Sequence, residues 1–296
     1  MGLFSKSKGE SSKGESSKTK EAAAEAEAQG EASSHLAPPP AYDSDDARSS
    51  VSSEAPEYTR PRFHEQGSAM VALPPAFNVY ASWRSPTKLW IGSSADEKKY
   101  LITQTFGWSS KKPPITLHSG LSADDPRMVQ VGPGRWKLSQ ECTITVPSRS
   151  DRPDPDLNVN AGYRSQSWHE WNYTFTMPVQ VQGSTPQEHT FQWRTTTGEE
   201  VKLLDKGSRW SSGWKLVWTT GPESGEGVGF GGDGREVVAV AARSSKSMRK
   251  VIRFNFMGTG LTGTLGGDWE LVVAATALQL WWEEQQAAAV STATAA

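Results

Sequence analysis

Five cationic side chains lie within eleven residues near the end of the chain, with no acidic residue among them: Arg243, Lys246, Arg249, Lys250 and Arg253. An arginine guanidinium can donate two parallel hydrogen bonds to one phosphate group, and a lysine adds a compact positive charge. On a turn between two strands, such a set could bind the phosphate groups of an anionic phospholipid, including a phosphoinositide. The alternative interpretation is an ordinary solvated hairpin loop, because charged side chains are mostly exposed to water.

A second segment suited to recognition is Pro39-Pro40-Ala41-Tyr42, which matches the PPxY pattern. Proline favours the polyproline II conformation, so docking into an aromatic-lined groove costs little conformational entropy. PPxY segments are ligands of WW domains, including those of HECT-type ubiquitin ligases. We therefore predict a WW-domain partner that binds Pro39, Pro40 and Tyr42. The alternative is a chance match in a proline-rich linker.

Residues that could act as nucleophiles or metal ligands do not form a recognisable set. The single cysteine, Cys142, lies in a strand-like segment, and no spacing pairs it with His118, His169 or His189. The same scattering argues against a zinc site. The acidic run D-R-P-D-P-D at 151–156 is broken by prolines and lacks the spacing of a calcium loop. We therefore predict no catalytic residues and no metal.

A glycine-rich segment, Gly227 to Gly232, matches the pattern G-x-G-x-x-G. A phosphate-binding loop of this kind needs a strand before it and a helix after it. Here the following residues, R-E-V-V-A-V from Arg235, are strand-like. The segment is therefore interpreted as a hairpin loop, and no nucleotide cofactor is expected.

The element most informative about the fold is Asp268–Gln285, which is apolar almost all the way round a helix, with Thr276 and Gln279 as polar interruptions. A helix without a polar stripe must be enclosed by lipid or by protein. Its apolar run lies between Glu270 and Glu283. This run is shorter than the about 20 apolar residues that a helix needs to cross a bilayer. We therefore predict that protein surrounds this helix.

Upstream of this helix, apolar and polar side chains alternate with a period of two, which is the pattern of half-buried strands. The pattern predicts about a dozen strands and no clear helix before the last one. The predicted strands are Asn78–Trp83, Lys88–Ile91, Tyr100–Phe106, Ile115–His118, Met128–Val131, Lys137–Val146, Trp171–Met177, Phe191–Arg194, Glu200–Leu204, Trp214–Trp218, Glu236–Ala242 and Ile252–Phe256.

So many strands without intervening helices favour all-β closure over βαβ units. Side chains alone fill the lumen of a barrel of about eight strands, so a wider barrel needs something else inside. The apolar helix is the candidate that the sequence offers. The predicted fold class is all-β with one helix: a closed, roughly twelve-stranded β-barrel that encloses a C-terminal hydrophobic helix.

Composition divides the chain into three parts. Residues 1–75 are low in complexity, with 8 Lys and Arg against 12 Asp and Glu. They hold too few large apolar side chains to offset the entropy lost on ordering. We expect a disordered tail over 1–75 that carries the PPxY motif, followed by a barrel domain over 76–285 with its central helix at 269–284. Residues 286–296 are expected to form a disordered or frayed tail.

Five segments together carry a resemblance to a known family: F-Q-W-R-T-T-T-G-E-E-V at 191–201, G-W-K-L-V at 213–217, E-V-V-A-V at 236–240, K-V-I-R-F-N-F at 250–256 and G-D-W-E-L from 267. Over about residues 77–284 the chain resembles the tubby C-terminal-like superfamily, which also includes the LURP-one-related and phospholipid-scramblase-like proteins. Its pattern is nearest to that of small uncharacterised fungal members. The resemblance implies a twelve-stranded barrel threaded by a C-terminal hydrophobic helix.

For function, the resemblance implies phosphoinositide or membrane binding, as in tubby-type members. Lipid scrambling is not expected, because the chain has one cysteine and lacks the acidic segment of scramblase-type members. The formal net charge of −2 gives no global attraction toward nucleic acid, and no such partner is expected. The lone cysteine fits a reducing compartment, and the segment M-G-L-F-S-K-S-K lacks the apolar stretch of a secretory signal.

We therefore expect a cytoplasmic monomer that attaches peripherally to a membrane face. Its predicted function is non-enzymatic: the barrel binds anionic phospholipid and the tail recruits a WW-domain protein. The alternative hypothesis is a soluble adaptor or substrate of a HECT-type ubiquitin ligase whose barrel binds a protein.

Overall fold

The structure is a computed structural model. It describes residues 73–82, 85, 87–105, 114–133, 141–148, 154–167, 170–181, 185–205, 211–222, 229–244, 247 and 249–295. The PPxY motif and the rest of residues 1–72 lie outside the described residues, as does Lys246 of the basic run.

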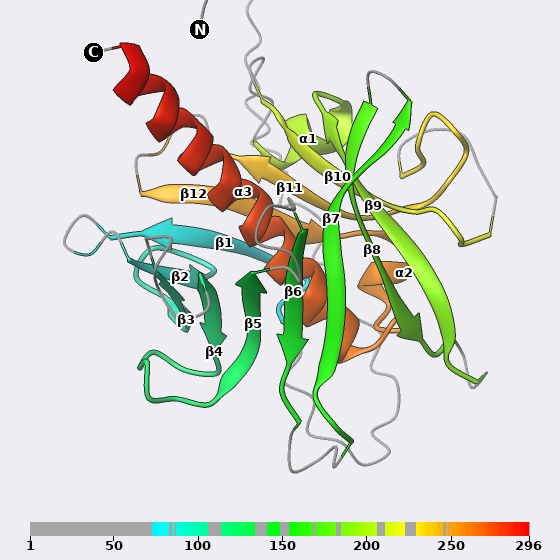
Figure 1. The fold of residues 1–296 in the computed structure, drawn as a ribbon, viewed down its shortest axis with the longest axis horizontal. Coiled ribbons are helices and arrows are strands. Elements are labelled where there is room, and N and C mark those ends of the chain that lie inside the picture. Colours follow the sequence, from blue (N-terminus) through cyan, green and yellow to red (C-terminus); the bar gives the residue numbers. More distant parts are fainter. Residues whose placement is uncertain are drawn as a thin grey trace, which may run out of the picture. The chain divides into compact units, whose positions relative to one another are not determined.

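Twelve antiparallel strands close into a barrel in which each strand pairs with its neighbours in sequence and β1 pairs with β12 (Figure 1). The strands are β1 (Ala76–Ala81), β2 (Lys88–Gly92), β3 (Lys98–Gln104), β4 (Ile115–His118), β5 (Arg127–Pro133), β6 (Glu141–Val146), β7 (Leu157–Ser167), β8 (Glu170–Val179), β9 (Gln187–Thr196), β10 (Gly213–Trp218), β11 (Val237–Arg243) and β12 (Lys250–Phe256). The predicted fold class is confirmed.

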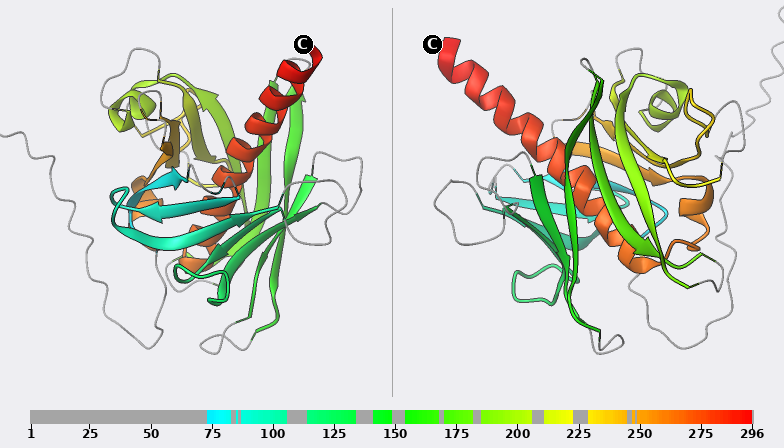
Figure 2. Two further views of the ribbon diagram at one scale, coloured as in Figure 1. Left: turned by 90° about the vertical axis from the view of Figure 1, so that its left-hand side faces the viewer. Right: turned by 45° about the vertical axis from the view of Figure 1, so that its right-hand side comes forward.

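Helix α3 (Gly267–Ala295) passes through the barrel, with strands around it in each view (Figures 1 and 2). Every residue from Leu271 to Leu280 is at most 6% exposed, as expected for a helix without a polar stripe. Its polar interruption Thr276 donates to the Val273 carbonyl at 2.8 Å and accepts from Trp193 Nε1 on β9 at 2.9 Å. The buried hydroxyl is therefore satisfied, and it fixes the helix against the wall.

The strands alternate as predicted, with large apolar side chains directed at the helix. Tyr173, Phe175 and Met177 of β8 are at most 2% exposed, as are Ile252 and Phe254 of β12. These side chains belong to one continuous apolar cluster with α3. The barrel and its helix therefore share a single core.

A second, smaller core lies on the outer side of the wall. Helix α1 (Glu199–Leu204) buries Val201 against Val217 of β10 and Val240 of β11. Strand β11 is therefore buried on both faces, which explains its continuous run of small apolar residues. A further short helix, α2 (Gly258–Leu261), follows β12.

Three sequence-based expectations about elements need correction. The segment Glu200–Leu204, predicted as a strand, is helix α1, and two short helices therefore precede α3. Strand β7 was not predicted, because its sequence, L-N-V-N-A-G-Y-R-S-Q-S, is rich in small and polar residues. Helix α3 continues to Ala295, so the predicted disordered or frayed tail is helical over 286–295.

The last part of α3 projects beyond the strands (Figure 2). Side chains become partly exposed from Trp281 onward, and Gln285 is exposed. Among the described residues, no helix is both long and apolar enough to cross a membrane.

Candidate functional site

The five residues of the predicted basic site separate into different environments. Arg243 ends β11, Lys250 begins β12 and Arg253 lies within β12, whereas Arg249 precedes β12 in the turn. Lys246 cannot be placed, because it lies outside the described residues. The structure therefore describes four of the five positions.

Arg253 is part of the framework. Its Nη2 lies 3.4 Å from Asp205 Oδ1, and its Nη1 donates to the Leu204 carbonyl at 2.8 Å. The two side chains of the ion pair are 12% and 0% exposed. Asp205 also accepts a hydrogen bond from Ser211 at 3.0 Å. Arg253 therefore fastens the end of α1 to the barrel wall and is not directed at a ligand.

Arg243, a neighbour of Arg253 across the β11–β12 pair, is engaged on the opposite, inner face of the wall. Its guanidinium lies over the Trp214 ring, 4.9 Å from the centroid, and donates to the Ser212 hydroxyl at 3.2 Å. It also pairs with Glu284 of α3. Burial raises the pKa of Glu284, while the charge of Arg243 opposes that rise. Arg243 therefore ties the central helix to β10 and β11.

Of the two remaining cations, Arg249 borders a pocket on the outside of the barrel, and Lys250 lies over the ring of Tyr80, which lines the same pocket. This pocket, of about 270 Å³, is lined by Tyr80, Ala81, Ser82, Trp90, Ala95, Lys98 and Arg249. We call it the outer-wall pocket. Its residues come from β1, β2, the β2–β3 turn, the start of β3 and the turn before β12.

Strand register brings the pocket side chains together. Tyr80 of β1 is paired with Trp90 of β2 on one side and with Lys250 of β12 on the other. Lys98 is paired with Gly92 at the far end of β2. The backbone N–H of Ala81 donates to the carbonyl of Arg249 at 2.7 Å, which anchors the turn that carries this arginine.

Aromatic rings form the floor of the outer-wall pocket, and cations lie over them. Lys98 Nζ is 4.4 Å from the Trp90 ring centroid, and Lys250 Nζ is 5.6 Å from that of Tyr80. Distances within about 6 Å give favourable cation–π interactions. Burial raises the pKa of Tyr80, an effect that the positive charge of Arg253 opposes. The Tyr80 hydroxyl donates to the Ser93 carbonyl at 3.3 Å.

The β2–β3 turn forms one wall of the pocket and is tightly packed. A Cβ on Gly92 would lie 2.1 Å from the Glu97 carbonyl oxygen, so only glycine fits this turn. Asn78 Nδ2 donates to the Ser93 carbonyl at 3.0 Å, and the Ser93 hydroxyl donates to the Glu97 carboxylate. Since Glu97 is bound to its own turn, Lys98 and Arg249 make no ion pair with a carboxylate among the described residues.

This arrangement suits a small anion. Lys98 and Arg249 supply charge-assisted donors, and the rings of Trp90 and Tyr80 offer an apolar surface beside them. Sequence reasoning found Arg249 and Lys250 but missed Tyr80, Trp90 and Lys98. Period-two alternation places Tyr80 and Trp90 on outward positions, whereas Lys98 reaches that face through the irregularity in the β2–β3 pairing between Ile91 and Gly92. Their convergence depends on strand register, which the sequence pattern does not fix.

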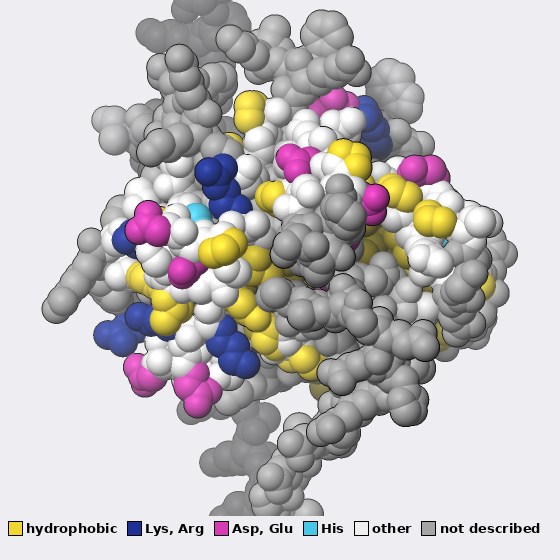
Figure 3. Space-filling model, turned by 90° about the horizontal axis from the view of Figure 1, so that it is seen from below, with side chains coloured by type: hydrophobic (Ala, Val, Ile, Leu, Met, Phe, Trp, Pro, Cys, Tyr) yellow, Lys and Arg dark blue, Asp and Glu magenta, His cyan; other side chains and the backbone are white. Residues whose placement is uncertain are grey.

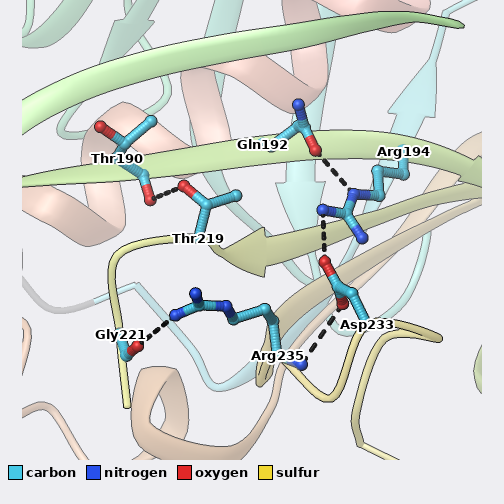
Figure 4. Close-up of polar contacts among 7 residues, drawn as sticks. All are labelled: Thr190, Gln192, Arg194, Thr219, Gly221, Asp233 and Arg235. Carbon is cyan, nitrogen blue, oxygen red and sulfur yellow. Dashed lines mark hydrogen bonds and ion pairs between the residues drawn. The ribbon is translucent and has the colours of Figure 1, made fainter. Parts of the chain in front are cut away.

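A second polar cluster, on the outer side of β9, is structural (Figure 4). Arg194 donates from Nε to Gln192 Oε1 at 2.7 Å, and its Nη2 lies 2.8 Å from Asp233 Oδ2. Burial alone would raise the pKa of Asp233, but the hydrogen bond and charge of Arg194 lower it. Arg235 donates to the Gly221 carbonyl at 2.8 Å. The cluster therefore holds the segments around 221 and 233 against β9.

The glycine-rich segment ends next to Asp233 of this cluster, and the expectation of a hairpin loop there is confirmed for its described part, 229–232. Gly229 and Gly234 have φ values of 103° and 72°. Strand β11, not a helix, follows at Val237. A phosphate loop needs that helix, because the N-terminal N–H groups contribute to anion binding.

Cys142 and His118, considered as catalytic or metal residues, are engaged in contacts within the fold, whereas His169 and Asp151 lie outside the described residues. Cys142 Sγ lies 2.9 Å from the Tyr173 hydroxyl, and burial raises the pKa of the thiol to about 12, which disfavours the reactive thiolate. His118 is held by Thr103 and the Asp125 carbonyl, each at 3.1 Å. Within the part of the chain that the structure describes, no group of three His, Cys, Asp or Glu side chains could hold a metal.

On the face seen from below, the described charged side chains do not form a field of a single sign. Figure 3 shows basic and acidic side chains interspersed there, with hydrophobic side chains between them.

No protein-family model, curated protein or solved structure matches the chain. The tubby-like resemblance therefore stays a prediction, and the functional argument depends on the geometry of the outer-wall pocket.

Proposed function

We propose that this chain is a non-enzymatic, membrane-associated binding protein whose barrel binds anionic phospholipid, with a phosphoinositide as the favoured class. The supporting observation is the outer-wall pocket, where Lys98 and Arg249 border the rings of Tyr80 and Trp90. The N-terminal segment recruits a WW-domain protein through Pro39, Pro40 and Tyr42.

The physical chemistry of the pocket suits a lipid head group at a membrane surface. Each lysine or arginine near an anionic leaflet contributes about 1 kcal/mol to binding. Tryptophan and tyrosine favour the interfacial layer, because their rings have an apolar body and a polar edge. Lys98, Arg249 and the half-buried Trp90 combine both properties at one place. The chain would attach peripherally, on the cytoplasmic face.

Vesicle flotation with the full chain tests the lipid half of the proposal. Neutral phosphatidylcholine vesicles are compared with vesicles that also contain phosphatidylserine or a phosphatidylinositol bisphosphate. We expect binding to the anionic vesicles, strongest with the bisphosphate. The double variant Lys98→Gln with Arg249→Gln should weaken binding roughly thirtyfold, since two cations are lost.

The matched control is Arg127→Gln with Lys202→Gln. It removes the same charge from the exposed Arg127 of β5 and the partly exposed Lys202 of α1, neither of which lines the pocket. Equal losses in both double variants would indicate binding by overall charge and would remove the pocket from the proposal. Absence of vesicle binding by the unsubstituted chain would favour the alternative, a soluble adaptor or substrate of a ubiquitin ligase.

The PPxY half is tested separately with isolated WW domains. Tyr42→Ala removes the side chain that fills the tyrosine pocket of such a domain. We expect this variant to lose binding that the unsubstituted chain shows, whereas Tyr58→Ala in the same tail should keep it. Binding that survives Tyr42→Ala would remove the motif from the proposal.

A further inference from the structure

The turn between β2 and β3, residues 93–97, carries a serine that is followed closely by two acids. Ser94, Asp96 and Glu97 are all exposed. Protein kinases select their substrates partly by charge, and one class prefers acidic residues two and three positions after the serine. The sequence S-A-D-E from Ser94 has that spacing. The turn therefore suits an acid-directed serine kinase.

The two neighbouring serines of this turn differ in how their hydroxyls are engaged. The Ser93 hydroxyl donates to the Glu97 carboxylate, and the Ser93 carbonyl accepts hydrogen bonds from Asn78 and Tyr80. The Ser94 oxygen accepts one hydrogen bond, from the Glu97 N–H at 3.1 Å, and donates to no group among the described residues. Ser94 therefore accepts a phosphoryl group at a smaller cost in contacts that shape the turn.

Ser94 directly precedes Ala95, which lines the outer-wall pocket together with Lys98 and Arg249. Consecutive Cα atoms are about 3.8 Å apart, so a phosphate on Ser94 lies within about one Debye length, about 8 Å, of the pocket wall. A phosphoserine carries a charge of about −1.5 to −2 at pH 7. This charge cancels most of the positive charge that Lys98 and Arg249 present to a ligand.

The acidic pattern by itself does not single out Ser94. The sequences S-A-D-D from Ser122 and T-G-E-E from Thr197 have the same spacing, and both hydroxyl residues are exposed. Neither is next to a residue that lines the pocket. Thr197 follows β9, which β1, β12, β11 and β10 separate from β2 around the closed barrel. The place of Ser94 beside the pocket is what gives its phosphorylation a consequence for binding.

We infer that Ser94 is a phosphorylation site whose phosphate lowers the affinity of the outer-wall pocket for anionic phospholipid. A kinase transfers the γ-phosphoryl group of ATP to Ser94. A P–O bond forms to Ser94 Oγ, the bond to the ADP leaving group breaks, and the hydroxyl proton goes to the catalytic base of the kinase. This regulation rests on the proposed function, since it acts on the same pocket. Phosphorylation releases the barrel from an anionic membrane, and removal of the phosphate restores binding.

The first experiment measures vesicle binding by full chains that carry one genetically encoded phosphoserine, Ser94→phosphoserine or Thr197→phosphoserine. Each charge near an anionic leaflet changes the affinity about fivefold. The phosphate at position 94 should therefore weaken binding to the phosphatidylserine vesicles roughly tenfold to thirtyfold. The same charge at position 197 lies far from the pocket and should change binding by less than about twofold.

Equal losses in the two phosphorylated chains would indicate repulsion by overall charge and would overturn the inference. The melting temperature of each chain, followed by circular dichroism, shows whether the fold is kept. If the chain phosphorylated at position 94 melts far below the unsubstituted chain, the lost binding belongs to unfolding, and the inference is likewise overturned.

The second experiment needs no lipid. A phosphorus NMR titration gives the second pKa of the phosphate at position 94, which Lys98 and Arg249 should lower by stabilising the dianion. Asp96 and Glu97 act on this pKa in every variant, so variants are compared with one another. Arg249→Gln should raise the pKa by a few tenths of a unit. Lys88→Gln removes an exposed cation at the start of β2, whereas the turn follows its end, and should leave the pKa unchanged. Equal shifts would overturn the contact with the pocket.

The third experiment measures the transfer itself. The full chain is incubated with ATP and casein kinase 2, an acid-directed serine kinase, and the modified residues are located by mass spectrometry. We expect phosphate on Ser94, and several-fold slower transfer to Ser94 in the Glu97→Gln chain, which keeps the shape of the side chain and loses its charge. Absence of phosphate from Ser94 would overturn its assignment as a modification site.

These readouts separate the inference from the proposed function. If no form of the chain binds vesicles, the phospholipid proposal fails, while the NMR titration and the mass spectrometry still decide whether Ser94 is modified beside the pocket. If the unsubstituted chain binds anionic vesicles and phosphoserine at position 94 leaves that binding unchanged, the proposed function stands and the inference is overturned.

Discussion

Arg249 and Arg253 belong to one basic run, and their surroundings give them opposite roles. Arg249 borders the outer-wall pocket, where the structure gives it no carboxylate among the described residues. Arg253 faces Asp205, a carboxylate with 0% exposure. A charged group that is buried away from water needs a partner of opposite charge. A charged group at the rim of a pocket is solvated by water and stays accessible to a ligand. Proximity in sequence therefore does not imply a shared role.

This difference predicts effects of very different size on the free energy of unfolding for two similar substitutions. Arg253→Met leaves Asp205 buried without its cation, which should lower the free energy of unfolding by about 3 kcal/mol. Arg249→Met should change it by less than about 0.5 kcal/mol, as is usual at exposed positions. Urea denaturation followed by circular dichroism measures both values. The double variant Asp205→Asn with Arg253→Met should recover much of the loss, because no unpaired buried charge remains.

A loss in Arg249→Met equal to that in Arg253→Met would contradict the division of roles. So would a double variant that is no more stable than Arg253→Met alone, since the cost would then come from lost packing of the arginine stem.

The basic run shows how much of a binding site can be predicted from residue types and spacing alone. The types and spacing of Arg243, Arg249 and Arg253 predicted donors for phosphate, and Arg249 does border a pocket. Arg243 and Arg253 form ion pairs with Glu284 and Asp205, which come from distant segments. Only the closed fold brings these partners near. Alternation of side chains along one strand carries no information about them.

At the scale of elements, burial on one face was easier to predict than secondary structure in short segments. Strand β8 has large side chains at alternate positions and was predicted well. Strand β7 directs Leu157, Val159, Ala161 and Tyr163 at the core, but the small Ala161 and the polar end R-S-Q-S weaken the period-two signal. In α1, E-E-V-K-L-L, the apolar run is too short to separate a strand from a helix. Its packing of Val201 on the outer wall decides the outcome.

Glu283 of α3, near the point where the helix leaves the barrel, predicts a dependence of stability on pH. Burial raises the pKa of the Glu283 carboxyl, against opposing contacts with Gln279 and Tyr163. The folded chain therefore holds this proton at pH values where the unfolded chain, with an ordinary value of 4.5, has lost it. Its contribution to stability is complete below that value and is lost as the pH rises through the folded pKa.

The substitution Glu283→Gln should remove this pH-dependent loss. The glutamine can still accept the hydrogen bond that Gln279 Nε2 donates to Glu283 at 2.7 Å. We expect the melting temperature of the variant, relative to the unsubstituted chain, to rise as the pH increases from about 4.5 toward 7. Glu188→Gln, at an exposed position of β9, serves as the control and should show a constant difference. A constant difference for Glu283→Gln as well would contradict burial as the cause.

For the whole molecule, the barrel and its central helix depend on each other. Twelve strands leave a lumen that their own side chains do not fill, and α3 supplies the missing volume. In turn, the helix is apolar on all sides and needs the wall to cover it. This mutual requirement made the fold class predictable, because the sequence shows both the alternating strands and the all-apolar helix. No comparable pair of sequence features indicates the outer-wall pocket.

The same dependence predicts where the chain can be shortened. A chain that ends after Gln286 loses only the projecting part of α3, whose described side chains are largely exposed. Its melting temperature should fall by no more than a few degrees, which corresponds to about 1 kcal/mol. A chain that ends after Thr276 also loses Leu278 and Leu280, each 2% exposed, and leaves part of the lumen empty.

Each large side chain lost from a core costs about 2–5 kcal/mol, and a domain has only about 5–15 kcal/mol in total. The shorter chain should therefore fail to give a cooperative thermal transition by circular dichroism. A cooperative transition near that of the full chain would show that the strands close without the helix. The single shared core, on which the interpretation of the fold depends, would then have to be abandoned.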